Sequence, residues 1–173
     1  ADAQQTVDLL PQILDTESPT YLRLLFPKIP KTIEPNSSVL GKNQILQNGS
    51  DITLIGNGQM VFECLQAAMV LKKEDNISVE VINVHTIKPF DSESIIDSLQ
   101  KTNKALVVEE HNSFGGLGSI VSYYASIHHP SPMSFLNTGD RFGNTGLPKE
   151  LLEEYGLQTS HIVSAIRKLI NTN

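Results

Sequence analysis

Short apolar runs alternate along most of this chain with longer stretches of mixed polarity. Residues 51–55 form a near-continuous apolar run, and 78–84 and 105–109 repeat it at helix-length intervals. Such spacing predicts buried strands connected by helices. The predicted strands are 51–55, 78–84, 105–109 and 132–136, and the predicted helices are 59–73, a helix that Asp91 opens as N-cap, 115–129, 148–155 and 160–170.

Strands joined by helices form a mainly parallel sheet, because right-handed crossovers place the helices on both of its faces. Residues 38–47, with Val39, Ile45 and Leu46, precede this pattern and predict an added strand or hairpin. The expected fold is therefore a three-layer α/β/α domain with about five strands, one of them antiparallel.

The first 38 residues have a different character. Val7, Leu10, Ile13 and Leu14 share one face of a predicted helix over 1–16, despite Pro11, and 19–25 is a short β-like run. The chain begins inside this helix without a methionine, which suggests a truncated N-terminus. Residues 26–38 contain three prolines and few helix formers, which predicts a linker.

Composition narrows the classes of function. The chain has 173 residues, a formal net charge of −6 and scattered basic residues, so nucleic acid and anionic lipid are unexpected partners. One cysteine, Cys64, excludes an internal disulfide, and no Cys and His cluster suggests a metal site. No apolar run reaches the roughly 20 residues that span a bilayer. We expect a cytoplasmic protein that binds neither a membrane nor a metal ion.

Two glycine-rich turns could hold phosphate groups. Residues 56–58 lie between a strand and a helix, and Glu80 lies where a dinucleotide fold has its ribose-binding acid, but Val61 replaces the third glycine. Residues 115–118 open a helix without a following lysine. For both turns we favour a structural role, with NAD binding and phosphate binding as the alternatives.

Two polar clusters follow predicted strands. Glu109, Glu110 and His111 lie at a strand's carboxyl end, where acid–base chemistry is possible, although no nucleophile or metal partner is evident. Asp140 and Arg141 precede a loop with Gly143 and Gly146, and we expect them to brace it. No catalytic residue is assigned to either cluster.

Four segments together resemble the C-terminal domain of transketolases. They are Asp140 to Leu157, Val84 to Asp91, Val107 to Asn112 and Gly115 to Ser119, and the resemblance runs from about Pro19 to the C-terminus. It implies residues 1–25 as a remnant of the pyrimidine-binding domain, 26–38 as the linker and 39–173 as the C-terminal domain.

Transketolases use thiamine diphosphate and Mg²⁺ to transfer a two-carbon ketol unit between sugars. The resemblance implies that these cofactors belong to the complete enzyme, because this chain has no Gly-Asp-Gly diphosphate motif and no glutamate placed to activate the aminopyrimidine. We expect the chain alone to be inactive and to serve domain packing and dimerisation. Its partner would be a second copy or a companion N-terminal segment that binds thiamine diphosphate.

Residues 21–28 resemble a transketolase strand that reads Arg-x-x-Arg-Pro, whose second arginine grips the substrate phosphate. Arg23 matches the first arginine, whereas Phe26 replaces the second. The substitution predicts an acceptor without phosphate at that position, or a contact recovered by Lys28. The resemblance also implies that Glu110, His111, Asp140 and Arg141 lie at an interface between domains or between subunits.

Other interpretations stay open. The β subunit of 2-oxoacid dehydrogenases and deoxyxylulose-phosphate synthase have similar C-terminal domains. Outside this family, the chain could be a non-enzymatic subunit-pairing module, or a dinucleotide-binding oxidoreductase resting on Gly56, Gly58 and Glu80.

Overall fold

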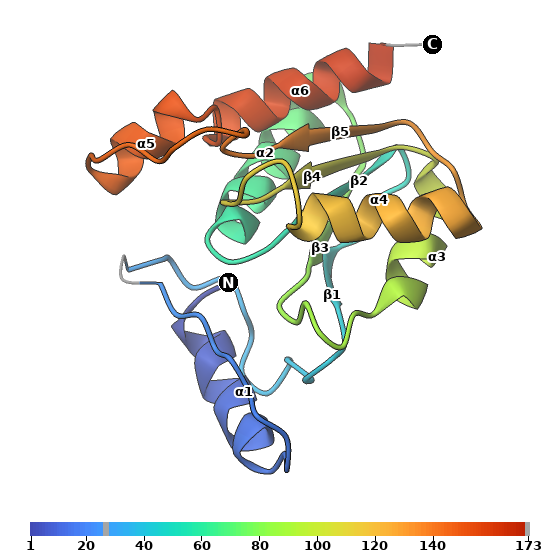
Figure 1. The fold of residues 1–173 in the computed structure, drawn as a ribbon. Coiled ribbons are helices and arrows are strands. Elements are labelled where there is room, and N and C mark those ends of the chain that lie inside the picture. Colours follow the sequence, from blue (N-terminus) through green and yellow to red (C-terminus); the bar gives the residue numbers. More distant parts are fainter. Residues whose placement is uncertain (26–27, 172–173) are drawn as a thin grey trace.

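A five-stranded sheet forms the centre of the computed structural model, which describes residues 1–25 and 28–171 (Figure 1). The strand order is β1-β3-β2-β4-β5, and β1 pairs antiparallel with β3 while the other pairs are parallel. The predicted fold class is thus confirmed. The strands are β1 (Gln44–Gln47), β2 (Ile52–Gly56), β3 (Val79–Asn83), β4 (Ala105–Val108) and β5 (Met133–Leu136).

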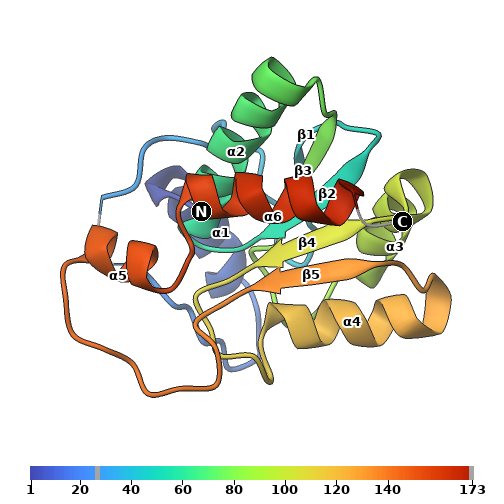
Figure 2. The same cartoon turned by 90° about the horizontal axis from the view of Figure 1, so that it is seen from above.

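Helices cover both faces of the sheet, so the domain has three layers (Figure 2). Alternate residues of a strand point to opposite faces. In β2, Leu54 packs in a core with α2 (Met60–Asp75) and α6 (Thr159–Asn171), whereas Ile55 packs in a second core with α3 (Ser92–Thr102) and α4 (Leu117–His128). A short helix, α5 (Pro148–Glu154), precedes α6.

The helix ends follow from local side-chain chemistry. Asp91 is the N-cap of α3, as predicted, and its carboxylate accepts the Ser94 N–H. Asn76 and Asn103 end α2 and α3 in the left-handed conformation, which asparagine tolerates better than most residues. These ends fix the turns between the helices and the following strands.

The N-terminal helix α1 (Ala3–Leu14) is present where a helix over 1–16 was predicted, and its apolar face is mostly exposed. Val7 and Leu14, on the predicted apolar face, are 65% and 75% exposed, whereas Gln5 and Leu9 on the opposite side are buried. The buried side is held by polar contacts: the Asp8 carboxylate accepts backbone N–H groups of residues 36–38. Most of the apolar face is therefore exposed, and of its four residues only Ile13 is half-buried.

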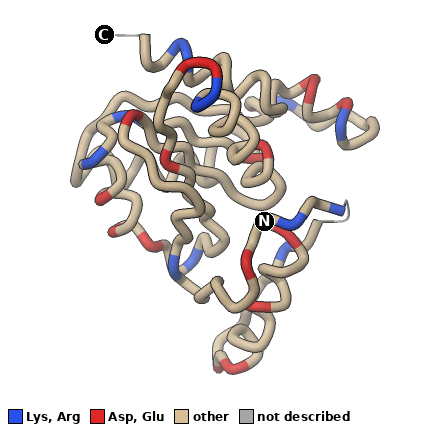
Figure 3. The backbone as a smooth tube through the Cα atoms, turned by 180° about the vertical axis from the view of Figure 1, so that it is seen from behind, with Lys and Arg blue, Asp and Glu red and all other residues tan. Residues whose placement is uncertain are grey.

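The predicted strand over 19–25 is absent, because no described strand lies beside this segment to complete a hydrogen-bonded ladder. Among the described residues, no helix is long and apolar enough to cross a membrane. Lysine and arginine are spread over separate elements rather than gathered on one, as Figure 3 shows.

Candidate functional site

The sheet has a topological switch point between its two central strands. β2 and β4 are neighbours, but the chain continues from β2 to β3 on one side and from β4 to β5 on the other. In open α/β sheets, ligands bind beyond the carboxyl ends of the strands at such a point. Residues 57–59 and 109–111 follow these two strands, so the predicted site residues Glu110 and His111 lie at this edge.

Gln59 and Glu110 join the two sides of the switch point. The side-chain amide of Gln59, just before α2, donates a hydrogen bond to the half-buried Glu110 carboxylate. Burial raises the pKa of Glu110, while the Gln59 bond and the positive charge of Arg23 oppose that rise. Arg23, predicted to bind substrate, thus lies within electrostatic reach of Glu110.

Leu25 and residues 28–30 lie near the N-terminal end of α2. A side-chain methyl group of Leu25 lies 3.7 Å from the place where a Cβ on Gly58 would be. Farther along, Lys28, Ile29 and Pro30 line a small cavity of about 170 Å³ together with Gln59, Phe62, Glu63 and Leu152. Gln59 therefore contacts Glu110 and also borders the cavity next to Lys28.

Glu109 fills the second glycine-rich turn. Its buried carboxylate accepts the backbone N–H groups of Leu117 at 2.6 Å and Gly118 at 2.8 Å, at the start of α4. A Cβ on Gly116 would come within 2.1 Å of the same carboxylate. The turn is glycine-rich because a carboxylate of the chain itself occupies it, so the structural interpretation is confirmed and the phosphate alternative is wrong.

The loop that begins at Asp140 is braced mainly by Tyr155. The Arg141 guanidinium lies 4.3 Å from the centre of the Tyr155 ring, and the Tyr155 hydroxyl accepts the Asn144 backbone N–H at 2.8 Å. Arg141 also donates to the Thr138 carbonyl. Bracing is therefore confirmed for Arg141, but it runs through Tyr155 rather than through the Asp140 carboxylate, for which the described contacts include no such bond.

His111 joins this loop to the switch point. Its carbonyl accepts both the backbone N–H and the hydroxyl of Thr138, and its ring is exposed. Two exposed aromatic side chains lie nearby in sequence: Phe142 is 98% exposed and Phe114 is 69% exposed. The structure thus connects Glu110, His111 and Arg141 through one edge of the sheet.

Glu80 does not lie where a ribose ligand would have to be. It is fully buried in the middle of β3 and pairs with Lys101 of α3. Glu80 is therefore not placed to bind the ribose of a dinucleotide, as the dinucleotide-binding alternative would require. Cys64 is fully buried as well, and burial raises the pKa of its thiol, so it is a core residue and no nucleophile.

The start of α4 does not fit the diphosphate of thiamine diphosphate. A diphosphate needs free backbone N–H groups, and Glu109 already occupies those at the start of α4. Within residues 1–25 and 28–171, no three His, Cys, Asp or Glu side chains come together as a metal site would require.

Comparison with known proteins identifies the fold's family. The protein-family model described as transketolase, C-terminal domain matches residues 41–162, which is more than half of the chain. This chain belongs to the transketolase family.

Two relatives are subunits of named transketolases. The chain is 37% identical over 169 residues to the SqwH subunit of 6-deoxy-6-sulfo-D-fructose transketolase from Clostridium sp. (strain MSTE9), covering 97% of this chain and 52% of that protein. It is 34% identical over 163 residues to a subunit of apulose-4-phosphate transketolase from Phocaeicola vulgatus, covering 93% and 52%. The chain spans about half the length of these curated relatives.

A solved structure agrees closely with the fold. It is a split gene transketolase, described as an inactive β4 tetramer, with a TM-score of 0.93, 33% identity, and coverage of 98% of this chain and 56% of that one. The chain is also similar to 1-deoxy-D-xylulose-5-phosphate synthase from Geobacillus sp. (strain WCH70), at 37% identity over 76% of this chain, and to the β subunit of the pyruvate dehydrogenase E1 component from Dictyostelium discoideum, at 34% identity over 78%.

Proposed function

We propose that this chain is the C-terminal part of a thiamine-diphosphate-dependent transketolase that transfers a two-carbon ketol unit between sugar-like substrates. The observation that carries the proposal is its likeness, over 98% of the chain, to a split gene transketolase chain. The transketolase subunits named above support it, because they too match along nearly all of this chain.

The division of the chain is part of this proposal. Residues 1–25 are the end of the pyrimidine-binding domain, 26–38 are the linker and 39–173 are the C-terminal domain. The outward apolar face of α1 supports it: Val7, Leu10 and Leu14 are exposed here, and the remainder of a pyrimidine-binding domain would bury them. The aromatic Tyr21, 89% exposed, fits the same interpretation.

The proposed cofactors and partner follow from this division of the chain into domains. Thiamine diphosphate and Mg²⁺ belong to the remaining part of the enzyme, and this chain contributes positioning and packing rather than a catalytic group. That part is a companion segment, and the complete enzyme pairs into a dimer in the cytoplasm. Glu110, His111, Asp140 and Arg141 lie at the boundary, where the exposed Phe142 offers an apolar contact.

Arg23 and Lys28 are the proposed substrate-binding residues. Both are exposed and lie on the segment near the N-terminal end of α2. Phe26, which replaces the phosphate-gripping arginine, lies outside the described residues. The names of two relatives mention sugars with a sulfonate or a phosphate at one end. We infer a sugar-like substrate, and the end of it that is remote from the transferred two-carbon unit reaches Arg23 and Lys28.

A second candidate is a subunit-pairing module without activity of its own. The observation that favours it is the solved relative, whose β chains form a tetramer described as inactive. On this interpretation the chain alone associates with further copies of itself through surfaces that the companion segment otherwise covers.

Ketol transfer tests the first proposal. The chain alone, and the complete enzyme with its thiamine-diphosphate-binding part, are assayed with a ketose donor and several aldose acceptors. Transfer by the complete enzyme and none by the chain alone would support the proposal. Transfer by the chain alone would contradict the division of labour, and no transfer by either would favour the pairing module.

A further inference from the structure

Helix α4 contains no aspartate, glutamate, lysine or arginine. It lies within residues 111–139, the longest stretch of the chain without these four residue types, although they make up 18% of all residues. Each of the other described helices carries at least one of them. Because a surface helix normally has charged residues on its solvent side, the composition of α4 is that of a helix covered on all sides.

One side of α4 is nevertheless exposed in this chain. Ser119, Tyr123, Ser126 and Ile127 follow the spacing that places residues on one face of a helix, and they form the outer face of α4. Tyr123 is 62% exposed and Ile127 is 56% exposed. Figure 2 shows α4 at one edge of the domain, beside the last strand of the sheet. An aromatic and an aliphatic side chain thus lie together on a face without charges.

The serines of α4 need no hydrogen-bond partner outside their own chain. The hydroxyls of Ser122 and Ser126 donate to carbonyl oxygens of α4 itself, at 2.7 and 2.8 Å. The Ser119 hydroxyl accepts the backbone N–H of Gly115 at 2.9 Å. A buried polar group is costly only when it has no partner. The outer face of α4 can therefore be covered by apolar groups without leaving these hydroxyls unsatisfied.

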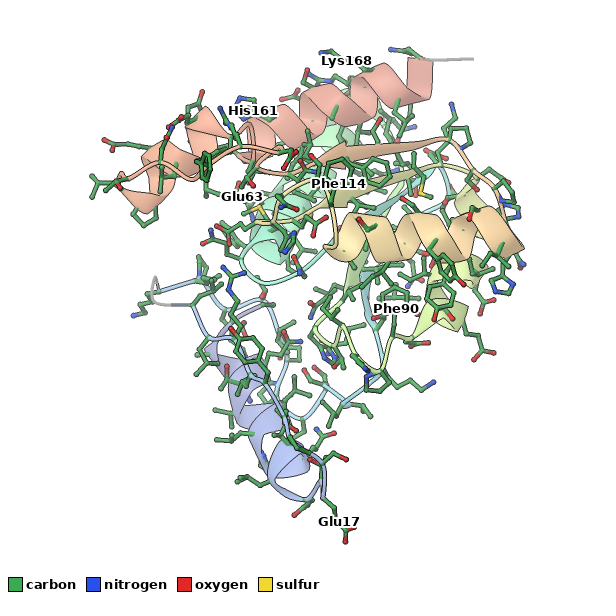
Figure 4. All side chains as sticks on the ribbon, in the orientation of Figure 1. Glu17, Glu63, Phe90, Phe114, His161 and Lys168 are labelled. Atoms are coloured by element: carbon green, nitrogen blue, oxygen red, sulfur yellow. The ribbon has the colours of Figure 1, made fainter. Side chains whose placement is uncertain are left out.

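Aromatic contacts hold the exposed ring of Tyr123 in place. The ring of Tyr124 is stacked on Phe90, which lies below α4 in Figure 4, with ring centres 5.4 Å apart. On its other side Tyr124 is stacked with His128 at 6.4 Å, and Tyr123 meets it edge-on at 5.3 Å. Side chains that are ordered in advance lose little conformational entropy when a partner binds. Tyr is also enriched in the centres of protein interfaces.

The absence of both signs of charge favours a second copy of the chain as the partner. The net charge of −6 makes two copies repel each other over most of their surfaces. Near a two-fold axis a side chain meets its own copy, so a charge of either sign is unfavourable there. A partner with a different surface could match each charge with an opposite one, and its binding would not require a face without charges.

We propose that two copies of this chain pack about a two-fold axis through the outer faces of their α4 helices, with Tyr123 and Ile127 at the centre of the contact. The inference rests on the proposed function, which includes pairing of the enzyme, and it deepens that function by assigning the surface. The edge strand β5 is only four residues long and Pro132 directly precedes it, which disfavours extension of the sheet across the axis. Side chains of α4 therefore make the contact.

Ile127→Glu tests this surface, because it places like charges from the two copies next to the axis. Sedimentation of the chain over a dilution series measures the dissociation constant of the pair. We expect the constant to rise at least about tenfold, since the new charge is buried at the contact without a partner. Met69→Glu is the matched control: Met69 is 53% exposed on α2, on the opposite face of the sheet, and the constant should stay within about twofold.

Ile127→Lys separates a lost contact from a lost fold. It should weaken pairing by itself, as Ile127→Glu does. An equal mixture of the two variants should pair at least about tenfold more tightly than either variant alone, because opposite charges then meet across the axis. A folding defect in either variant would not be restored by mixing.

The outcomes separate the inference from the proposed function. A wild-type chain that stays monomeric, unchanged pairing in Ile127→Glu, or a mixture that pairs no better than its components overturns the inference. It is also overturned if Ile127→Glu blocks only association with the thiamine-diphosphate-binding part, since that part would then cover α4. Ketol transfer by the complete enzyme is assayed separately: its absence refutes the proposed function even where pairing through α4 is found, and its presence leaves that function standing where such pairing fails.

Discussion

Replacing Glu109 by glutamine should destabilise the domain strongly, because its carboxylate anchors the start of α4. Glu109 is 3% exposed, and its carboxylate accepts two backbone N–H groups, at 2.6 and 2.8 Å. Hydrogen bonds to a charged group are worth roughly 1.5–3 kcal/mol each. A glutamine keeps one acceptor oxygen and turns an NH₂ group toward the other N–H, and it loses the favourable interaction with the helix dipole.

The expected loss is therefore about 2–4 kcal/mol of the free energy of unfolding, a large part of the roughly 5–15 kcal/mol typical of a domain. Urea unfolding followed by circular dichroism would measure it, with unchanged m-value as a check that the transition stays two-state. Asp97→Asn, at an exposed position, should change the same quantity by less than about 0.5 kcal/mol. If the free energy of unfolding of Glu109→Gln differs from that of the wild type by less than about 0.5 kcal/mol, the assigned role of Glu109 is wrong.

Three further predictions concern neighbouring groups. Gly116→Ala should cost about 1–3 kcal/mol in the same urea experiment, because its Cβ would lie 2.1 Å from a Glu109 oxygen; unaltered stability would show that the turn has room. The buried Cys64 thiol, whose pKa burial raises, should react with an aromatic disulfide at pH 8 only after urea unfolding, and rapid labelling of the folded chain would count against this core position. Burial raises the pKa of Glu110, so the folded state binds its proton more tightly than the unfolded state; the wild type should lose stability relative to Glu110→Gln as the pH rises from about 4 through the folded-state pKa, and a difference independent of pH would contradict this sign.

The periodicity of the sequence predicted the sheet and its helices well. β2, β3 and β4 are buried on both faces, so their apolar runs are nearly continuous and stand out from the helices between them. The helix α1 shows where such reasoning fails. An apolar helix face usually packs inward, but here polar side chains such as Asp8 hold the helix to residues 36–38 and leave Val7 exposed.

The candidate site was only partly predictable. Glu110 and His111 were found because they follow a strand, and the switch point confirms their position at the sheet edge. Gln59 was missed, because an uncharged side chain between a glycine and a methionine gives no sign of chemistry by itself. Its role depends on Glu110, 51 residues away along the chain, and only the packing of β2 beside β4 brings the two together.

Reconstitution of ketol transfer tests the central proposal most directly. The thiamine-diphosphate-binding part of the enzyme is assayed with thiamine diphosphate and Mg²⁺, alone and after addition of this chain, with a ketose donor and aldose acceptor. We predict transfer only in the mixture, with a rate that saturates as the two parts reach equal amounts. Full activity without this chain, or none in the mixture despite stable association, would contradict its assignment as the C-terminal part of a transketolase.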